Sequence, residues 1–171
     1  MRIAAIPSDK AKPEACNRFG AKSPAPAAAV DMSSAGPSAG TTTWMAVDQL
    51  AVVLERSPRS DDCHWLGPSD ADRMARMSRR VRRDQFLAGR WLLREMLASL
   101  FPPTHAIDWR LGGISGQAPS ILECPSAASL SAPLFLTVSH SGERVAAAVS
   151  TSPVGIDLES VRPGRNLLEL A

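Results

Sequence analysis

The sequence predicts an α+β domain, in which helices come first and a group of short strands follows. Between residues 80 and 100, apolar residues recur at the spacing of an amphipathic helix. From Ile107 onward the apolar residues alternate instead, in runs separated by Gly, Pro and Ser. Hydrophobic residues make up 44% of the 171 positions, which is enough to form a core. A run of helices and then a run of strands is typical of the α+β class.

Residues 1–43 are predicted to be a disordered tail. Most of them are Ala, Ser, Pro, Gly or Thr, and Phe19 is their one aromatic residue. Such a segment buries too little apolar surface to offset the entropy lost on ordering. We therefore expect the folded domain to span residues 44–171.

A first strand and two helices are predicted at the start of this domain. Residues 44–54 are rich in β-branched and apolar residues, which favours a strand. A short helix begins with Ser69 or Asp70 as its N-cap and continues through Met77. A longer helix covers Arg80–Leu100 and ends before a pair of prolines.

Four strands are predicted after the long helix, because apolar and polar residues alternate there between loop-forming residues. They cover residues 107–111, 134–139, 145–149 and 154–159. A new amphipathic helix begins at residues 166–171, where the sequence stops. We therefore expect the domain to be incomplete.

Charge and composition exclude several classes of protein. The net charge of +2 is too small to indicate a nucleic-acid or membrane-surface protein by itself. No apolar run is long enough to span a bilayer, and the N-terminus lacks the apolar core of a signal peptide. Three scattered cysteines form neither a disulfide framework nor a zinc motif. These features predict a cytoplasmic protein without a membrane partner.

Two carboxylates near the end of the chain form a candidate metal site. Asp157 and Glu159 alternate with Ile156 and Leu158, so on a strand the two acids share one face and the two apolar residues share the other. Magnesium commonly takes one or two protein carboxylates and completes its shell with phosphate and water oxygens. The alternative is an exposed polar face of an edge strand.

A second candidate site is Ser139-His140-Ser141-Gly142, at the end of an apolar run. Hydroxyls, an imidazole and backbone N–H groups at such a position suit the oxygens of a phosphate. A serine hydrolase is disfavoured, because adjacent strand residues face opposite ways and Ser139 and His140 cannot pair without a sharp turn. A polar surface turn is the simpler interpretation.

Basic residues are concentrated before and within the long helix. These residues are Arg73, Arg76, Arg79, Arg80, Arg82, Arg83, Arg90 and Arg94. They could contact a polyanion or form a solvated helix face. Arg90 stands among apolar neighbours, so we expect it to be shielded and to need an anionic partner.

Taken in order, these motifs resemble the 4′-phosphopantetheinyl transferase superfamily, of the surfactin-synthetase-activating type. The similarity extends over residues 44–171. The matching segments are Arg83-Asp-Gln-Phe-Leu-Ala-Gly-Arg-Trp-Leu-Leu-Arg94, Gly116-Gln-Ala-Pro119, Val138-Ser-His-Ser-Gly142 and Pro153-Val-Gly-Ile-Asp-Leu-Glu159. The resemblance implies a fold of two similar α+β halves, of which this chain holds the first and the opening of the second.

The resemblance also implies a function. Such an enzyme transfers the phosphopantetheine arm of coenzyme A to a serine of an acyl or peptidyl carrier protein, with magnesium as cofactor. By position, Arg90, Ser139 and His140 correspond to residues that bind the coenzyme A phosphates. Asp157 and Glu159 correspond to catalytic carboxylates that hold the metal. The expected partners are therefore coenzyme A and a carrier protein, and no nucleic acid.

The sequence departs from the family pattern in two places. The family's Gly-Lys-Pro loop is Gly116-Gln117-Ala118-Pro119 here, without the lysine, and the later helix motif with its Lys-Glu pair is absent. That glutamate is the family's third metal carboxylate and expected base, so we expect weak or no transfer by these 171 residues. Two alternatives stay open: a non-catalytic remnant that binds coenzyme A or a carrier protein, and an unrelated arginine-rich module for RNA or another polyanion.

Overall fold

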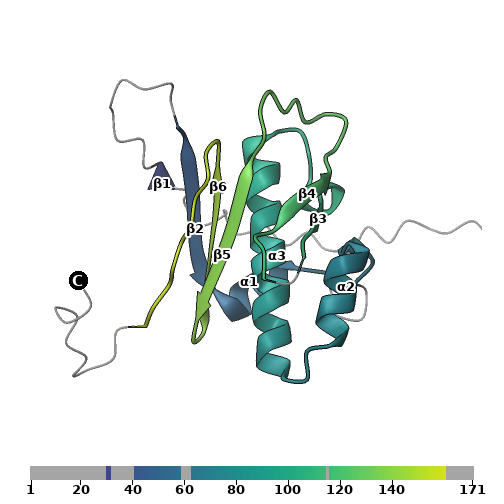
Figure 1. The fold of residues 1–171 in the computed structure, drawn as a ribbon, viewed down its shortest axis with the longest axis vertical. Coiled ribbons are helices and arrows are strands. Elements are labelled where there is room, and N and C mark those ends of the chain that lie inside the picture. Colours follow the sequence, from purple (N-terminus) through teal and green to yellow (C-terminus); the bar gives the residue numbers. More distant parts are fainter. Residues whose placement is uncertain (1–29, 32–40, 59–62, 115, 161–171) are drawn as a thin grey trace, which may run out of the picture.

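The computed structural model describes residues 30–31, 41–58, 63–114 and 116–160 (Figure 1). These residues form helices and antiparallel sheets, so the predicted α+β class is confirmed. The helices are α1 (Leu50–Arg56), α2 (Pro68–Ala75) and α3 (Arg80–Leu100), with short 3-10 turns at Cys63–Trp65 and Ala106–Asp108. The strands are β1 (Val30–Asp31), β2 (Thr43–Gln49), β3 (Arg110–Gly112), β4 (Ser120–Glu123), β5 (Phe135–Ser141) and β6 (Arg144–Ser150). Most of the predicted tail and the predicted helix at 166–171 lie outside the described residues.

The larger sheet is antiparallel and has the strand order β1-β2-β6-β5. Its central strand β6 pairs along its full length with both β2 and β5, so that Val149 stands between Trp44 and Leu136. The short apolar side chains of β6 are buried on both faces of the sheet. Strands β5 and β6 were predicted close to these bounds, and Gly142 supplies the turn between them. The expected alternation is absent from β6, because its residues 145–149 are all apolar and buried.

Helix α3 packs on one face of this sheet and contributes more residues to the core than any other element (Figure 1). Its bounds are those predicted from the sequence. Leu93 and Leu97 of the helix are fully inaccessible, as are Val145 and Val149 of β6. Gly89 lets the helix approach β5, because a β-carbon there would lie 2.6 Å from Val138 Cγ1.

This close approach gives a testable prediction. Gly89→Ala is expected to destabilise the fold by about 1–3 kcal/mol, because the added methyl group overpacks the helix–sheet interface. Urea unfolding at neutral pH measures the change. Val138→Ala removes the opposing methyl groups, so the double variant is expected to be less destabilised than the sum of the two single variants. A double variant whose loss of unfolding free energy equals the sum of the two single losses would contradict this account.

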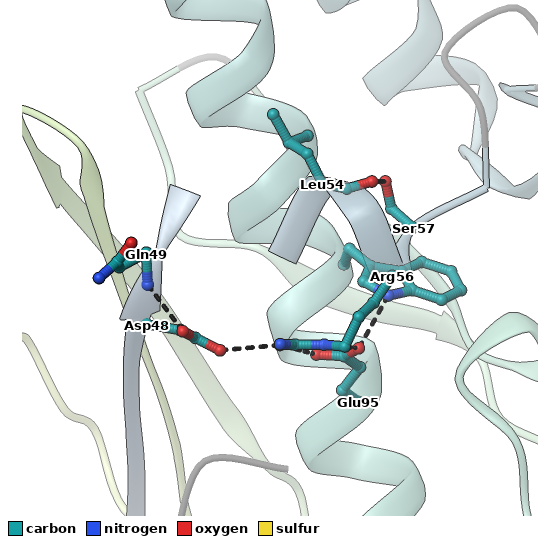
Figure 2. Close-up of polar contacts among 7 residues, drawn as sticks. Asp48, Gln49, Leu54, Arg56, Ser57 and Glu95 are labelled. Atoms are coloured by element: carbon teal, nitrogen blue, oxygen red, sulfur yellow. Dashed lines mark hydrogen bonds and ion pairs between the residues drawn. The ribbon is translucent and has the colours of Figure 1, made fainter. Parts of the chain in front are cut away.

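The predicted first strand is wrong beyond Gln49, where the chain turns into helix α1. Leu50, Val53 and Leu54 have helical spacing and pack into the core, with Val53 fully buried. The Arg56 guanidinium then bridges Asp48 of β2 and Glu95 of α3, with donor–acceptor distances of 2.9 Å to each (Figure 2). These two carboxylates raise the pKa of Arg56. The helix is therefore favoured by long-range partners that a local sequence pattern does not reveal.

The start of the next helix also differs from the prediction. Helix α2 begins at Pro68 with Gly67 as its N-cap and ends at Ala75, so neither Ser69 nor Asp70 is the cap. Proline is well suited to the first helical position, because its missing N–H has no partner there in any case. Asp70 is instead fully inaccessible and faces α3.

Two of the predicted strands are corrected as well. The range 107–111 divides into the turn Ala106–Asp108 and the short strand β3, which pairs with the unpredicted strand β4. The range 154–159 forms no strand. Its predicted alternation nevertheless holds, because residues 154, 156 and 158 are half-buried while 155, 157 and 159 are exposed.

Residues 151–160, here called the return segment, run back along the sheet after β6 (Figure 1). At its start, the Thr151 N–H donates to the Thr42 carbonyl. Near its end, the N–H groups of Leu158 and Ser160 donate to the hydroxyls of Ser139 and Ser141. Because Leu136 and Val138 face the core, the alternating serines face the other way. The return segment therefore lies on the sheet face opposite α3.

Helix α3 also carries a buried cation. Arg94 is fully inaccessible and donates to the backbone carbonyls of Trp65 and Trp109 at 2.8 and 2.9 Å, with its guanidinium over the Trp65 ring. Burial lowers the pKa of Arg94 to about 10, so the group stays charged at neutral pH. Arg94 thus ties α3 to two segments outside the sheet. No helix in the described part of the chain is long and apolar enough to cross a membrane.

Candidate functional site

Three pockets meet at His140, near the end of β5. The first has a volume of about 560 Å³ and lies between α3, β5 and the loop before β4. A second pocket borders the start of α3 and the β5–β6 turn, and a third, of about 400 Å³, lies between that turn and the return segment. His140 lines all three. The half-buried imidazole therefore marks the centre of the candidate site.

The first pocket is lined by residues from motifs that are far apart in the sequence. Arg82 and Arg90 come from α3, Gln117 and Pro119 from the loop, and His140 from β5. The fold thus brings together three of the four segments on which the family resemblance depends. No lysine is among the described residues that line this pocket, and Gln117-Ala118 stands in the loop where the family pattern has one.

Arg90 has the shielded position and the anionic partner that the sequence indicates. Its guanidinium forms two hydrogen bonds with the Asp70 carboxylate, at 2.6 and 2.9 Å, and both side chains are at most 5% exposed. These bonds use Nε and Nη2, and Nη1 makes no hydrogen bond with the described residues. The Phe86 ring lies under the same guanidinium, 4.9 Å from its carbon. Arg90 is therefore held rigidly at the pocket wall, with one amino group left for a ligand.

The first turn of α3 adds positive charge beside His140. Arg79 is the N-cap, and it makes no capping hydrogen bond with its side chain. Arg79, Arg80 and Arg82 line the second pocket, and Arg82 Nη1 lies 3.4 Å from His140 Nε2. Cations at a helix N-terminus oppose the helix dipole, which favours anions at that end. An anionic ligand would relieve this repulsion, so the charge pattern favours phosphate binding.

The two predicted carboxylates line the third pocket together. Asp157 and Glu159 both border it, with His140 opposite them on β5. Both acids are exposed, and they alternate with the half-buried residues Ile156 and Leu158. The structure therefore brings both acids to the same site as His140.

Ser139 differs from the expectation that it faces a phosphate. It lines none of these three pockets. Its hydroxyl instead donates to Asp157 Oδ1 at 3.1 Å and accepts the Leu158 N–H at 3.0 Å. Ser139 is thus in contact with one member of the acid pair, Asp157.

The donor set suits magnesium only with the help of a ligand. Among the described residues, no group of three or more His, Cys, Asp or Glu side chains is placed to hold a metal ion. Two carboxylates are nevertheless within the usual number of protein ligands for magnesium when phosphate oxygens complete the octahedron. Asp157 and Glu159 therefore fit a metal that arrives with, or is completed by, a diphosphate.

Sequence reasoning missed two residues that shape the site. Asp70 was considered only as a helix cap, and its pairing with a residue 20 positions later has no local signal. Phe86 lies four positions before Arg90 on the same helix, a spacing that places the two side chains side by side. That spacing could have identified Phe86 from the sequence as a neighbour of Arg90. Arg73 lies over the same ring at 5.4 Å and lines the first pocket.

No protein-family model matches this sequence, and no curated protein matches it either. Function is therefore inferred from the residues and their geometry.

Proposed function

We propose that this chain descends from a 4′-phosphopantetheinyl transferase and binds coenzyme A together with magnesium at the site around His140. The observation that carries the proposal is the meeting of the four motif segments around one imidazole, which lines all three pockets. Arginines lie on one side of it and two carboxylates on the other. A metal ion separates like charges when a polyanion binds near acids, which explains why both kinds of charge occur together.

Each group has a role that follows from its chemistry. Arg90 Nη1, Arg82 and His140 would donate hydrogen bonds to phosphate oxygens in the first pocket, which all three residues line. Asp157 and Glu159 would hold magnesium, which neutralises charge on the diphosphate when it is bound. Phe86 and the buried Asp70 fix the orientation of the arginine and exclude water from one side of it.

The proposal extends to the reaction. In the proposed transfer, the serine oxygen of an acyl or peptidyl carrier protein attacks the β-phosphorus of coenzyme A. A new O–P bond forms, the diphosphate O–P bond breaks, and adenosine 3′,5′-bisphosphate leaves. The serine proton needs a base, and the described residues place no third carboxylate beside Asp157 and Glu159. We therefore expect transfer by these residues alone to be slow or absent, because a general base is worth about 10²–10⁴-fold.

Calorimetric titration with coenzyme A tests the binding step. Binding is expected in magnesium and is expected to weaken at least about tenfold in EDTA or in Asp157→Asn. The reason is that even groups that support a metal ligand contribute about 10–100-fold to metal affinity. Glu55→Gln is the matched control, because this exposed acid of α1 lines none of the three pockets. Equal affinity in magnesium and in EDTA would contradict the proposal.

A non-catalytic remnant is the second candidate, and the two-carboxylate donor set favours it. Binding of coenzyme A that is lost in Arg90→Ala, with no labelling of a carrier protein in magnesium, would select it. Robust labelling would select the enzyme. Binding of RNA with a steep salt dependence, unchanged by Asp157→Ala, would instead indicate a polyanion module.

A further inference from the structure

We infer that Ser139 and Ser141 are positioning residues, which hold the acid pair by fastening the return segment to the edge strand β5. This inference rests on the proposed function, since it concerns how the metal-binding carboxylates are held. It assigns Ser139 a role other than direct contact with a phosphate. It also gives a role to Ser141, which the sequence analysis named only as part of a motif.

The first observation is the register of the hydrogen bonds. The Leu158 N–H donates to Ser139 Oγ at 3.0 Å, and the Ser160 N–H donates to Ser141 Oγ at 3.1 Å. Both partners advance by two residues, so the return segment runs parallel to β5. In an extended chain, N–H groups two residues apart point to the same side. The two serine hydroxyls therefore accept hydrogen bonds from two N–H groups on the same side of the return segment, two residues apart.

The second observation concerns the single proton of the Ser139 hydroxyl. A serine hydroxyl has one donor and two acceptor sites. Ser139 gives its proton to Asp157 Oδ1 at 3.1 Å and uses an acceptor site for the Leu158 N–H. Phosphate oxygens only accept hydrogen bonds at neutral pH unless they carry a proton. While the contact with Asp157 persists, Ser139 therefore has no proton to donate to a phosphate.

The third observation is the orientation that these bonds impose. The Leu158 N–H also lies 2.9 Å from Asp157 Oδ1, so the serine, the amide and the carboxylate form one closed group. This arrangement fixes Oδ1 and leaves Oδ2 for other contacts. With Leu158 half-buried toward the sheet, Asp157 and Glu159 face the pocket shared with His140. Without the two serines, the acids would sit on an extended segment that no β-ladder holds.

Amide exchange measured by NMR tests the fastening without any ligand. Ser139→Ala is expected to speed exchange of the Leu158 amide by about three- to tenfold, the value of one hydrogen bond. Ser141→Ala is expected to do the same for the Ser160 amide. Ser139→Thr keeps the hydroxyl and is expected to preserve protection. Ser129→Ala is the matched control, because this exposed serine lies in the loop before β5. Unchanged Leu158 exchange in Ser139→Ala would overturn the inference.

A titration with Mn²⁺ alone tests the consequence for the acids. This paramagnetic substitute for magnesium broadens the amide signals of nearby residues, so it reports metal binding in the absence of coenzyme A. In Ser139→Ala, half-maximal broadening at residues 157–159 is expected at about three- to tenfold higher Mn²⁺ than in the wild type. Ser139→Thr is expected to restore the wild-type value. The same half-saturation in all three proteins, or no broadening in the wild type, would overturn the positioning role.

The two proposals fail in different ways. If Mn²⁺ binds as expected and coenzyme A does not bind, the proposed function fails and the positioning role stands. If Ser139→Ala loses coenzyme A affinity at saturating magnesium while the Leu158 amide stays protected, Ser139 contacts the ligand directly. That result would leave the proposed function intact and overturn the positioning role.

Discussion

Asp70→Asn is expected to lower the free energy of unfolding by about 3–5 kcal/mol, because it leaves the Arg90 cation in the interior without its counter-charge. Asp70 is completely inaccessible and Arg90 is 5% exposed, so solvent cannot take the place of the lost partner. The bidentate geometry, with distances of 2.6 and 2.9 Å, also ties α2 to α3 at the wall of the first pocket.

Urea unfolding at neutral pH measures this change. Asp72→Asn is the matched control, since Asp72 is an exposed acid on the same helix and its replacement is expected to alter stability by less than about 0.5 kcal/mol. Replacing both partners, as in Asp70→Leu with Arg90→Met, is expected to recover part of the loss, because no buried charge is then left unpaired. A loss below about 1 kcal/mol in Asp70→Asn would show that the pair is solvated or replaced.

Trp109→Ala is expected to destabilise the protein by a similar amount, about 3–5 kcal/mol, through the cavity that it leaves. Trp109 is the largest of the fully inaccessible side chains in the described part of the chain. Its ring packs against Phe101 with the centroids 5.6 Å apart, and its indole N–H donates to the Thr104 hydroxyl at 3.0 Å. The backbone carbonyl of the same residue accepts a hydrogen bond from Arg94, so disorder at this position would also loosen the buried cation.

Thermal and urea unfolding both report this change. Trp109→Phe keeps most of the ring and removes the N–H, so a smaller loss of about 1–2 kcal/mol is expected. Ile107→Ala is the control, because Ile107 belongs to the same short segment and is 46% exposed. Equal losses in Trp109→Ala and Ile107→Ala would contradict a packing effect specific to the buried ring.

The sequence was sufficient for the elements whose pattern is local. Helix α3 has an apolar stripe over 21 residues, and its predicted bounds agree with the structure. Strand β5 alternates and β6 is a continuous apolar run, and the positive φ of 57° at Gly142 makes the turn between them. The alternation of residues 154–159 was also correct, because a polar and apolar period of two describes any extended chain on an apolar surface.

The remaining differences come from partners that are distant in the sequence. Helix α1 follows β2 because the Leu50 N–H meets the Glu143 carbonyl and Arg56 reaches Glu95. Strand β4 is only four residues long and is defined by its pairing with β3. The residues of the candidate site also divide into those that a local motif indicates and those that depend on a distant partner. His140, Asp157 and Glu159 were predicted from short motifs, whereas the Asp70 that orients Arg90 lies on another helix.

The small side chains on the second face of the sheet set the distance between the sheet and the return segment that carries Asp157 and Glu159. Ala146 and Ala148 lie there, next to Ser139 and Thr137 on β5, and they are 3% and 0% exposed. Because these alanine side chains are small, the return segment lies close enough to the sheet for the short serine side chains to accept hydrogen bonds from its N–H groups. A bulkier residue in place of either alanine would push the return segment away from the sheet. Asp157 and Glu159 would then move away from His140 even though the new side chain does not contact them. The small size of Ala146 and Ala148 thus contributes to the geometry of the candidate site, although neither alanine lines a pocket there.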